Sequence, residues 1–175
     1  EWQRKVGKQV NFGTLYGMGP RRLVSELAAQ GIAMSMEEAK EALESWRKTY
    51  ARAAEFIREW GIQAVEQGYT ETALGRRRHY PPPQSPSEAA AIERQGGNLP
   101  IQGTAADIMK LAMANLRQLS PVLQVHDELV LEVPERDADE VAALVRQRMV
   151  EAATSVLDGF PVEVEVAVGK CWAEA

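Results

Sequence analysis

The chain has 175 residues, which is enough for one compact domain or for two lobes that share a boundary. Hydrophobic residues make up 45% and charged residues 26%, the composition of an ordinary soluble protein. The net charge of −5 argues mildly against nucleic-acid binding, yet basic residues cluster in the first half and acidic residues become common after Asp127. The one cysteine, Cys171, excludes an internal disulfide and a cysteine-based zinc site.

No apolar run is long enough to span a membrane, and no signal-peptide pattern is present. We therefore expect a cytoplasmic protein without a membrane partner. The chain begins with Glu1 and not with Met, and the residues up to Gly13 have the pattern of an element without a preceding cap. This start indicates a piece of a longer protein.

The first part of the chain is predicted to be helical. Helices are expected over 3–16 and 21–30, with glycine and proline breaking the chain between them. Ser35 and Glu38 have the spacing of a capping box, which predicts the start of a third helix. Apolar residues then recur every three or four positions, which predicts one long helix ending at Gly68. These apolar positions are Ala39, Leu43, Trp46, Tyr50, Ala53, Ile57 and Trp60.

The middle of the chain alternates between short elements. A strand is predicted over 69–74, and the segment 85–88 has the cap, proline and acid that begin a helix. That helix is expected to stop at the glycines 96–97. The next helix is expected over 104–119.

The last third changes character. Apolar residues on both sides of a polar centre at 126–128 predict a hairpin over 122–133. A helix is expected over 135–157, and strict alternation of valine with polar or small residues predicts a half-buried strand over 162–168. The fold class is therefore predicted as α+β, with a helical first part and an antiparallel sheet with covering helices.

Four side chains at intervals of four residues form the first candidate site. Arg4, Lys8, Phe12 and Tyr16 would share a slanted face of one helix. The cations suit a triphosphate, and the aromatic rings offer a flat surface to a base. From spacing alone, the more common alternative is a solvated basic turn that leads into core aromatic residues.

The polar centre of the predicted hairpin is the second candidate site. A carboxylate of Asp127 or Glu128 at a hairpin tip can bind a divalent metal, and two such metals about 4 Å apart can drive phosphoryl transfer. One carboxylate pair is too little for a two-metal site, and a plain acidic turn is the alternative. His126 is equally well explained as a hydrogen-bonded turn residue or as a functional group.

A basic run beside Gly75 is the third candidate. Such a run suits contact with phosphates, although a solvated charge run explains it equally well. The run consists of Arg76, Arg77 and Arg78.

Polar side chains among glycines form the fourth candidate. Arg94, Asn98 and Gln102 could reach base edges or sugars in a minor groove. The favoured alternative is that Asn98 and Gln102 cap the helix expected to start near Thr104.

Four segments in order resemble the motifs of family A DNA polymerases, the bacterial DNA polymerase I type. Residues 8–18 (KQVNFGTLYGM) resemble the fingers-helix motif of that family. The segments 75–78 (GRRR), 100–107 (PIQGTAAD) and 123–129 (LQVHDEL) follow in the family's order, and 162–172 resembles its closing strand. The resemblance covers nearly the whole chain.

The resemblance implies part of a right-hand polymerase fold. Residues 1–70 would form helical fingers, and 71–175 the C-terminal part of an antiparallel palm. The upstream palm, the thumb and any exonuclease region are expected to lie outside this chain. The full-length enzyme is expected to be monomeric, and the chain alone to be inactive.

The resemblance also implies roles for the first candidate site. Arg4 and Lys8 would hold the triphosphate of a dNTP, and Lys8 would donate a proton to the leaving pyrophosphate. Phe12 would pack on the sugar and base and, being Phe and not Tyr, implies discrimination against dideoxynucleotides. Tyr16 would lie near the templating position.

In the palm, the resemblance implies that Asp127 binds catalytic Mg²⁺, one of two ions whose other ligands lie outside the chain. Glu128 would be its less essential neighbour, and His126 would contact the primer end. The primer 3′-hydroxyl would attack the α-phosphate, and pyrophosphate would leave. The residues expected to contact primer–template DNA are Arg76, Arg77, Arg78, Arg94, Asn98 and Gln102.

Two other functions remain open at this point. One is a single-subunit RNA polymerase with the same fingers and palm, against which the runs QVHDE and QGTAAD favour a DNA polymerase. The other is a non-catalytic DNA-binding fragment, against which the intact Lys8 and Asp127 argue.

Overall fold

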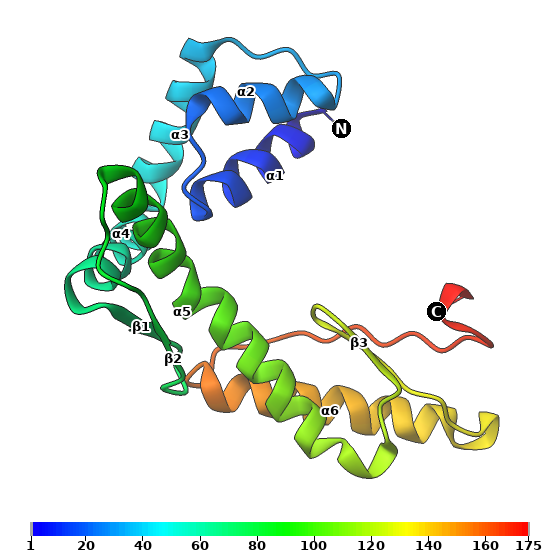
Figure 1. The fold of residues 1–175 in the computed structure, drawn as a ribbon. Coiled ribbons are helices and arrows are strands. Elements are labelled where there is room, and N and C mark those ends of the chain that lie inside the picture. Colours follow the sequence, from blue (N-terminus) through cyan, green and yellow to red (C-terminus); the bar gives the residue numbers. More distant parts are fainter. Residues whose placement is uncertain (1, 175) are drawn as a thin grey trace. The chain divides into compact units, whose positions relative to one another are not determined.

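The computed structural model describes residues 2–174, which are mostly helical and contain two small antiparallel sheets (Figure 1). The predicted α+β class is confirmed. The chain divides into two compact units. Unit 1 contains the residues up to Glu71 together with Arg77–Ile101, and unit 2 contains Thr72–Arg76 and the residues from Gln102 onward.

Three helices begin unit 1. Helices α1 (Trp2–Leu15), α2 (Pro20–Ala29) and α3 (Met36–Thr49) pack against one another. The first two predicted helices are confirmed within one residue at each end. The core that the three helices share contains Val10, Leu23, Leu27, Ala39, Leu43 and Trp46.

The predicted capping box is present at the start of α3. The Ser35 hydroxyl accepts a hydrogen bond from the Glu38 amide at 3.2 Å, and the Glu38 carboxylate accepts one from the Ser35 amide at 2.7 Å. The single long helix to Gly68 is wrong, because Tyr50 (φ −109°, ψ 48°) separates α3 from α4 (Ala51–Gln67). Backbone hydrogen bonds continue on both sides of Tyr50, so the apolar spacing is preserved and does not reveal the break.

Helix α5 (Pro86–Asn115) is longer than either helix predicted in its place. Its start is as predicted, with the Ser85 hydroxyl accepting a hydrogen bond from the Glu88 amide at 3.2 Å. The predicted stop at 96–97 and the predicted new start at Thr104 are both wrong, since α5 continues through both places.

The glycines of α5 are explained by the close approach of α4. A Cβ atom at Gly96 would lie 2.3 Å from Cβ of Ala64, and one at Gly97 would lie 2.6 Å from the Ile57 carbonyl oxygen. On α4, a Cβ at Gly61 would lie 2.7 Å from a carbonyl oxygen of α5. Glycine is thus used where the two backbones touch, and this tertiary contact outweighs its low helix propensity.

A short hairpin completes unit 1. Strand β1 (Tyr69–Glu71) pairs antiparallel with β2 (Arg77–His79). The predicted strand over 69–74 is therefore present but shorter. The buried hydroxyls of Thr70 and Tyr80 lie 3.2 Å apart and form a hydrogen bond beside this hairpin.

Unit 2 contains the second hairpin and a long helix. Strands β3 (Leu123–Val125) and β4 (Glu128–Val130) pair antiparallel, and α6 (Ala138–Val156) follows a short 3-10 turn at Glu135–Asp137. The predicted hairpin and helix are confirmed. The buried apolar residues of this unit are Met109, Ala112, Leu116, Val145, Ala152 and Ala153.

The predicted strand over 162–168 is wrong, because residues 160–169 have no regular secondary structure. Burial nevertheless alternates as expected, with Val162 and Val164 half-buried and Glu163 exposed. A strand also needs a hydrogen-bonded neighbour, and no segment within residues 2–174 pairs with this one. Among the helices of the described part, none is both long and apolar enough to cross a membrane.

Candidate functional site

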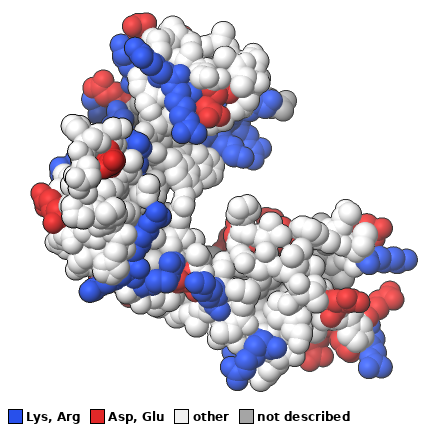
Figure 2. Space-filling view, viewed as in Figure 1, with Lys and Arg blue, Asp and Glu red and all other residues white. Residues whose placement is uncertain are grey.

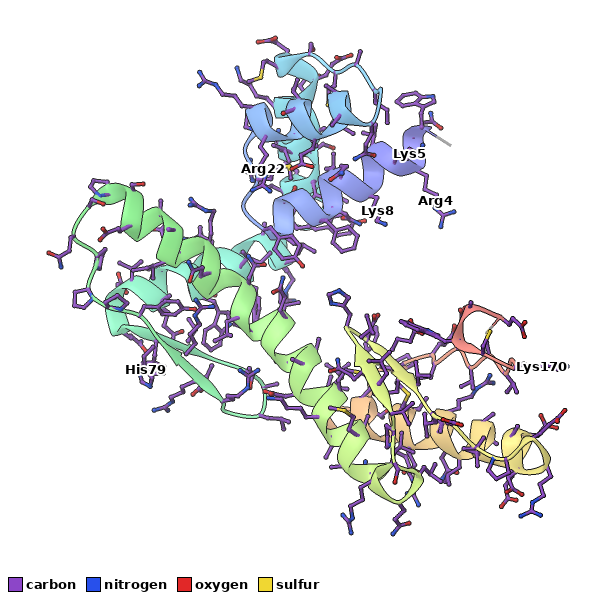
Figure 3. The ribbon with its side chains drawn as sticks, turned by 45° about the vertical axis from the view of Figure 1, so that its right-hand side comes forward. Arg4, Lys5, Lys8, Arg22, His79 and Lys170 are labelled. Carbon is purple, nitrogen blue, oxygen red and sulfur yellow. The ribbon has the colours of Figure 1, made fainter. Side chains whose placement is uncertain are left out.

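The first candidate site is an exposed face of α1. Phe12 and Tyr16 are 50% and 45% exposed, and Arg4 and Lys8 are also exposed. Figure 3 shows Arg4 and Lys8 projecting from α1 on the same side. The Lys8 Nζ lies 5.9 Å from the centre of the Phe12 ring, within range of a cation–π contact. The alternative that the two aromatic residues belong to the core is wrong.

The opposite face of α1 anchors the helix. Val10 and Thr14 are buried, and the Thr14 hydroxyl donates a 2.7 Å hydrogen bond to the Val10 carbonyl. The indole N–H of Trp46 on α3 donates to the side-chain oxygen of Asn11. These contacts fix the rotation of α1 about its axis, so the four site residues stay on the exposed side.

A cavity of about 250 Å³ lies beside Phe12 on α1 and Tyr16, which directly follows that helix. Gly17 follows with φ +67°, a left-handed conformation that ends the helical run. A Cβ at Gly17 would lie 2.8 Å from Cγ of Arg94, so the Arg94 side chain passes directly over this glycine. The residues that line the cavity are Gln9, Phe12, Gly13, Tyr16, Met18, Arg22 and Glu26.

Arg94, Asn98 and Gln102 lie four residues apart within α5. The Asn98 side-chain amide donates a 2.8 Å hydrogen bond to the Arg94 carbonyl. The alternative that Asn98 and Gln102 cap a helix is wrong, because no helix begins near Thr104. Arg94 and Gln102 are exposed and Asn98 is half-buried.

Two arginines of the basic run are held on the β1–β2 hairpin. Arg77 forms a 2.9 Å ion pair with Glu71 and lies 4.6 Å from the centre of the Tyr69 ring. The hydrogen bond that Arg77 donates to the Glu71 carboxylate raises the pKa of Arg77. Arg78 donates a 2.6 Å hydrogen bond to Gln95. Figure 2 shows basic side chains along this hairpin and, separately, on the helices around α1.

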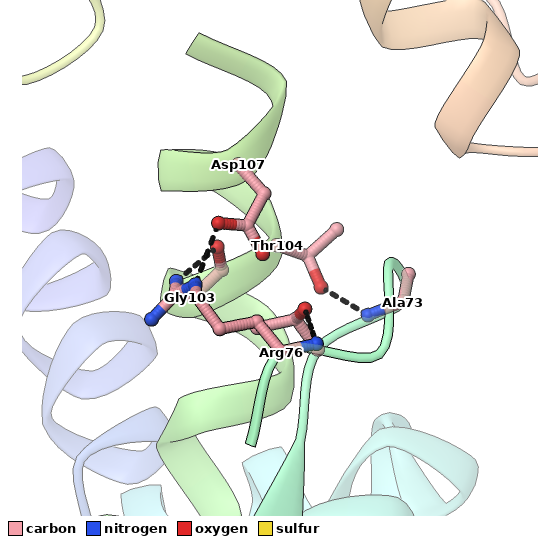
Figure 4. Close-up of polar contacts among 6 residues, drawn as sticks. Ala73, Arg76, Gly103, Thr104 and Asp107 are labelled. Carbon is pink, nitrogen blue, oxygen red and sulfur yellow. Dashed lines mark hydrogen bonds and ion pairs between the residues drawn. The ribbon is translucent and has the colours of Figure 1, made fainter. Parts of the chain in front are cut away.

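Arg76, the third member of the run, is tied into unit 2. Its Nε lies 2.7 Å from a carboxylate oxygen of Asp107, and its Nη2 donates to the Gly103 carbonyl at 3.1 Å (Figure 4). Burial raises the pKa of Asp107, but hydrogen bonds from Thr72 and Arg76 outweigh this. With the nearby charges of Arg76 and Lys110, the pKa ends below its usual value.

Sequence reasoning missed two members of this contact. Asp107 is buried in α5, and the neighbouring Thr104 hydroxyl accepts a 2.9 Å hydrogen bond from the Ala73 amide. Both residues stand in the GTAAD run, whose sequence predicts the start of a helix and resembles part of a family motif. No sequence signal indicated the contact, because Asp107 lies 31 residues from Arg76 and its burial is visible only in the structure.

The second candidate site is the tip of the β3–β4 hairpin. Val125 pairs with Glu128, so His126 and Asp127 form a two-residue turn with a left-handed φ of 53° at His126. The Gln124 side-chain amide donates to the His126 carbonyl at 2.6 Å, which braces the turn. All three residues of the tip are exposed.

The two carboxylates of the tip differ in their contacts. The Glu128 carboxylate accepts a hydrogen bond from the indole N–H of Trp172. Within residues 2–174, Asp127 forms neither a hydrogen bond nor an ion pair through its side chain. Carboxylate oxygens are the ligands that Mg²⁺ prefers, so the chemistry of the tip fits that ion. No three metal-binding side chains cluster in the described part of the chain, so these residues alone do not form a complete metal site.

The structure thus brings Arg4, Lys8, Phe12 and Tyr16 together in unit 1, and His126, Asp127 and Glu128 together in unit 2. It separates Arg76 from Arg77 and Arg78, which belong to unit 1.

Comparison with known proteins identifies the family. The pattern described as "DNA polymerase family A" matches residues 1–174. "DNA polymerase I, thermostable" of Thermus filiformis is 44% identical over 180 residues, covering 98% of this chain and 21% of that protein. "DNA polymerase I" of Pseudomonas aeruginosa is 41% identical over 183 residues, covering 99% of this chain and 19% of that protein.

A solved structure is also similar. The "POL domain of Pol1 from M. smegmatis complex with DNA primer-template and dNTP" matches with a TM-score of 0.75 and 38% identity, covering 85% of this chain and 27% of that one. The chain spans about one fifth of the length of the curated relatives it matches. It belongs to DNA polymerase family A.

Proposed function

We propose that the protein containing this chain is a template-directed DNA polymerase that transfers nucleotides from a dNTP to a primer 3′-hydroxyl. In this proposal residues 1–70 are fingers and 71–175 the C-terminal part of the palm. The single observation that carries it is the exposed cationic and aromatic face of α1 in a chain of this family. The names of the relatives favour a DNA polymerase over an RNA polymerase or a non-catalytic fragment.

The α1 face supplies the nucleotide contacts. Arg4 and Lys8 bind the triphosphate oxygens through charge-assisted hydrogen bonds. Phe12 packs on the sugar and base, and Tyr16 lies at the templating position. The short distance between Lys8 and the Phe12 ring supports these assignments, because one ligand that carries both a phosphate chain and a base can contact both side chains.

The hairpin tip supplies a metal ligand. Asp127 would hold one of two Mg²⁺ ions with Glu128 as its neighbour, and the remaining ligands would come from other parts of the protein. When bound, Mg²⁺ would supply activation of the primer hydroxyl and stabilisation of charge on the leaving oxygens. His126 contacts the primer end. The free side chain of Asp127 supports its assignment.

In the reaction, the primer 3′-hydroxyl loses its proton to solvent water, and its oxygen forms a bond to the α-phosphorus while the bond between that phosphorus and the bridging oxygen breaks. Pyrophosphate leaves, and Lys8 donates a proton to it. The residues of this chain therefore orient the nucleotide, hold part of the metal and complete the proton transfer.

Primer–template DNA is the proposed partner. Arg77 and Arg78 contact backbone phosphates, and Arg94, Asn98 and Gln102 contact the duplex near its minor groove. Two nitrogens of Arg76 are already bonded, so its main role is to hold the turn, and only its remaining N–H groups can reach a phosphate. The full-length protein is proposed to act as a cytoplasmic monomer.

Substitution of Lys8 tests the proposal in the full-length protein. Lys8→Ala is expected to lower kcat/KM for dNTP incorporation at least about 100-fold, the scale of losing one stabilising contact in a transition state. Lys5→Ala is the matched control, because Lys5 is an exposed lysine elsewhere on α1 and is expected to change kcat/KM less than about twofold. Equal losses in both variants would reject the assigned role of the α1 face.

A further inference from the structure

The hydrogen bond between Trp172 and Glu128 joins residues 44 positions apart. Its donor lies in the 3-10 turn Trp172–Glu174, and its acceptor lies next to Asp127 at the hairpin tip. No motif in the sequence predicts this contact. It ties the carboxyl-terminal turn to the segment proposed to hold metal.

The surroundings of Trp172 indicate that its contribution is the hydrogen bond from its N–H group and not burial of its ring. The side chain is 50% exposed, so the ring is poorly placed to serve as a core residue. The turn that presents it is held by local bonds, from the Glu174 amide to the Cys171 carbonyl at 3.0 Å and from the Lys170 amide to the Glu174 carboxylate at 3.3 Å. The indole therefore lies on a small turn held by local hydrogen bonds, and its one polar group, the N–H, donates to Glu128.

The acceptor side is equally well defined. Glu128 begins β4 and pairs with Val125, so the backbone from which its side chain projects is fixed by the β3–β4 ladder. The hydrogen bond then fixes the flexible carboxyl end. Asp127 sits in the turn, and its side chain has no hydrogen-bond or ion-pair partner among residues 2–174.

We propose that Trp172 is a positioning residue that holds the Glu128 carboxylate at the carboxyl-terminal turn and leaves Asp127 as the free carboxylate of the pair. This inference rests on the proposed metal-binding role of the hairpin tip. Two adjacent free carboxylates would favour Ca²⁺, which accepts more oxygen ligands in looser geometry than Mg²⁺. Trp172 therefore helps the site to prefer Mg²⁺ over Ca²⁺.

The contact itself is tested without any activity. The full-length protein is labelled with 5-fluorotryptophan, and the Trp172 fluorine signal is assigned as the one missing from Trp172→Phe. Glu128→Leu is expected to move that signal, while the control Glu132→Leu, at an exposed glutamate of the same segment, leaves it in place. An unmoved signal in Glu128→Leu would overturn the proposal.

The consequence is tested by metal competition. In Mg²⁺-dependent primer extension, Trp172→Phe is expected to lower the Ca²⁺ concentration for half-maximal inhibition about fivefold, with the Kd for primer–template DNA unchanged. In a Glu128→Leu background, Trp172→Phe should have no further effect, because Trp172 acts through that carboxylate. Calorimetric titration of Ca²⁺ into the same variants without nucleotide should show the same pattern.

An unchanged Ca²⁺ sensitivity in Trp172→Phe, or effects of the two substitutions that multiply independently, would overturn the positioning role. Asp127→Asn separates this failure from a failure of the proposed function. If that variant kept normal extension and Mg²⁺ dependence, the metal-binding role of the tip would be rejected, whereas the fluorine signal would still report whether Trp172 contacts Glu128.

Discussion

The Asp107 carboxylate on α5 accepts a 2.7 Å hydrogen bond from Nε of Arg76, which lies 31 residues earlier in the turn after β1. The acid is buried, whereas the Arg76 side chain is 44% exposed. The pair therefore lies at the edge of the interior of unit 2. Loss of the Asp107 carboxylate removes the partner of Arg76 and, with it, the contact that holds the turn after β1 against α5.

We expect Asp107→Ala in the full-length protein to lower the free energy of unfolding of this region by about 2 kcal/mol, less than for a fully buried pair because Arg76 is partly solvated. Hydrogen exchange at the amides of the β1–β2 turn, measured at increasing urea concentration, gives the change in the free energy of unfolding of this region. The control is Glu26→Ala, which removes an exposed ion pair with Arg22 and should have no measurable effect. Equal effects would contradict a structural role for Asp107.

The stabilisation by Asp107 should depend on pH in one direction. Its folded-state pKa is lowered, so the stability it contributes is fully present above the unfolded-state pKa of about 4 and is lost as the pH falls through the lower folded-state pKa. The difference in unfolding free energy between wild type and Asp107→Asn should be constant from about pH 7 to 5 and shrink below about pH 4. If the difference in unfolding free energy instead grew as the pH fell, the folded-state pKa of Asp107 would not be lowered and the prediction would be wrong.

Two glycine substitutions should have opposite effects on stability. Alanine normally stabilises a helix interior by up to about 1 kcal/mol relative to glycine. Gly7→Ala on α1 should do so, because nothing lies within 4 Å of the added Cβ. Gly96→Ala should instead destabilise by about 1–3 kcal/mol, since its Cβ would lie 2.3 Å from that of Ala64. Thermal unfolding of both full-length variants measures this, and a stabilised Gly96→Ala would refute the close α4–α5 approach.

Asp127→Asn should lower the rate of primer extension at least about 1000-fold, equivalent to about 4 kcal/mol of transition-state stabilisation. The Kd for primer–template DNA should stay nearly unchanged, because in the proposed function the exposed tip contributes a metal ligand and little binding surface. Asp158→Asn is the control, an exposed acid of unit 2 whose left-handed φ of 50° asparagine tolerates. Near-normal extension by Asp127→Asn would remove this residue from the metal site.

Phe12→Tyr should increase incorporation of dideoxynucleotides relative to deoxynucleotides by about fivefold or more. The added hydroxyl can supply a hydrogen bond where the 3′-hydroxyl of the nucleotide is missing, and one such bond contributes about 1 kcal/mol or more. Because the Phe12 ring is exposed, the new hydroxyl does not have to enter the protein interior. Competition between the two nucleotides in single-turnover extension measures the ratio, and an unchanged ratio would contradict a sugar contact at this position.

Local patterns predicted the elements that depend on neighbouring residues. The capping box at Ser35 and the hairpin around His126 each involve only a few adjacent positions, and both are present. The shared face of Arg4, Lys8, Phe12 and Tyr16 was predicted from helical geometry alone. The sequence did not decide whether the two aromatic rings are exposed, and the structure shows that they are. In each case the interactions that decide the structure are close in sequence.

The errors have long-range causes. The glycines 96–97 break an isolated helix, but in α5 they are sites of contact with α4. The alternation over 162–168 reports which side chains are half-buried and says nothing about a hydrogen-bonded neighbour. The contacts of Arg76 with Asp107 and of Trp172 with Glu128 span 31 and 44 residues, and neither pair has a local signature.

The crossing of α4 and α5 limits how segments of this protein can be exchanged with those of relatives. Gly61 on α4 faces the backbone of Glu93 on α5, whereas Gly96 and Gly97 on α5 face Ala64 and Ile57 on α4. None of the three glycine positions has room for a larger side chain. A chimaera that received only one of the two helices from a relative with bulkier residues there would force the backbones apart. The two helices therefore have to be transferred as a pair.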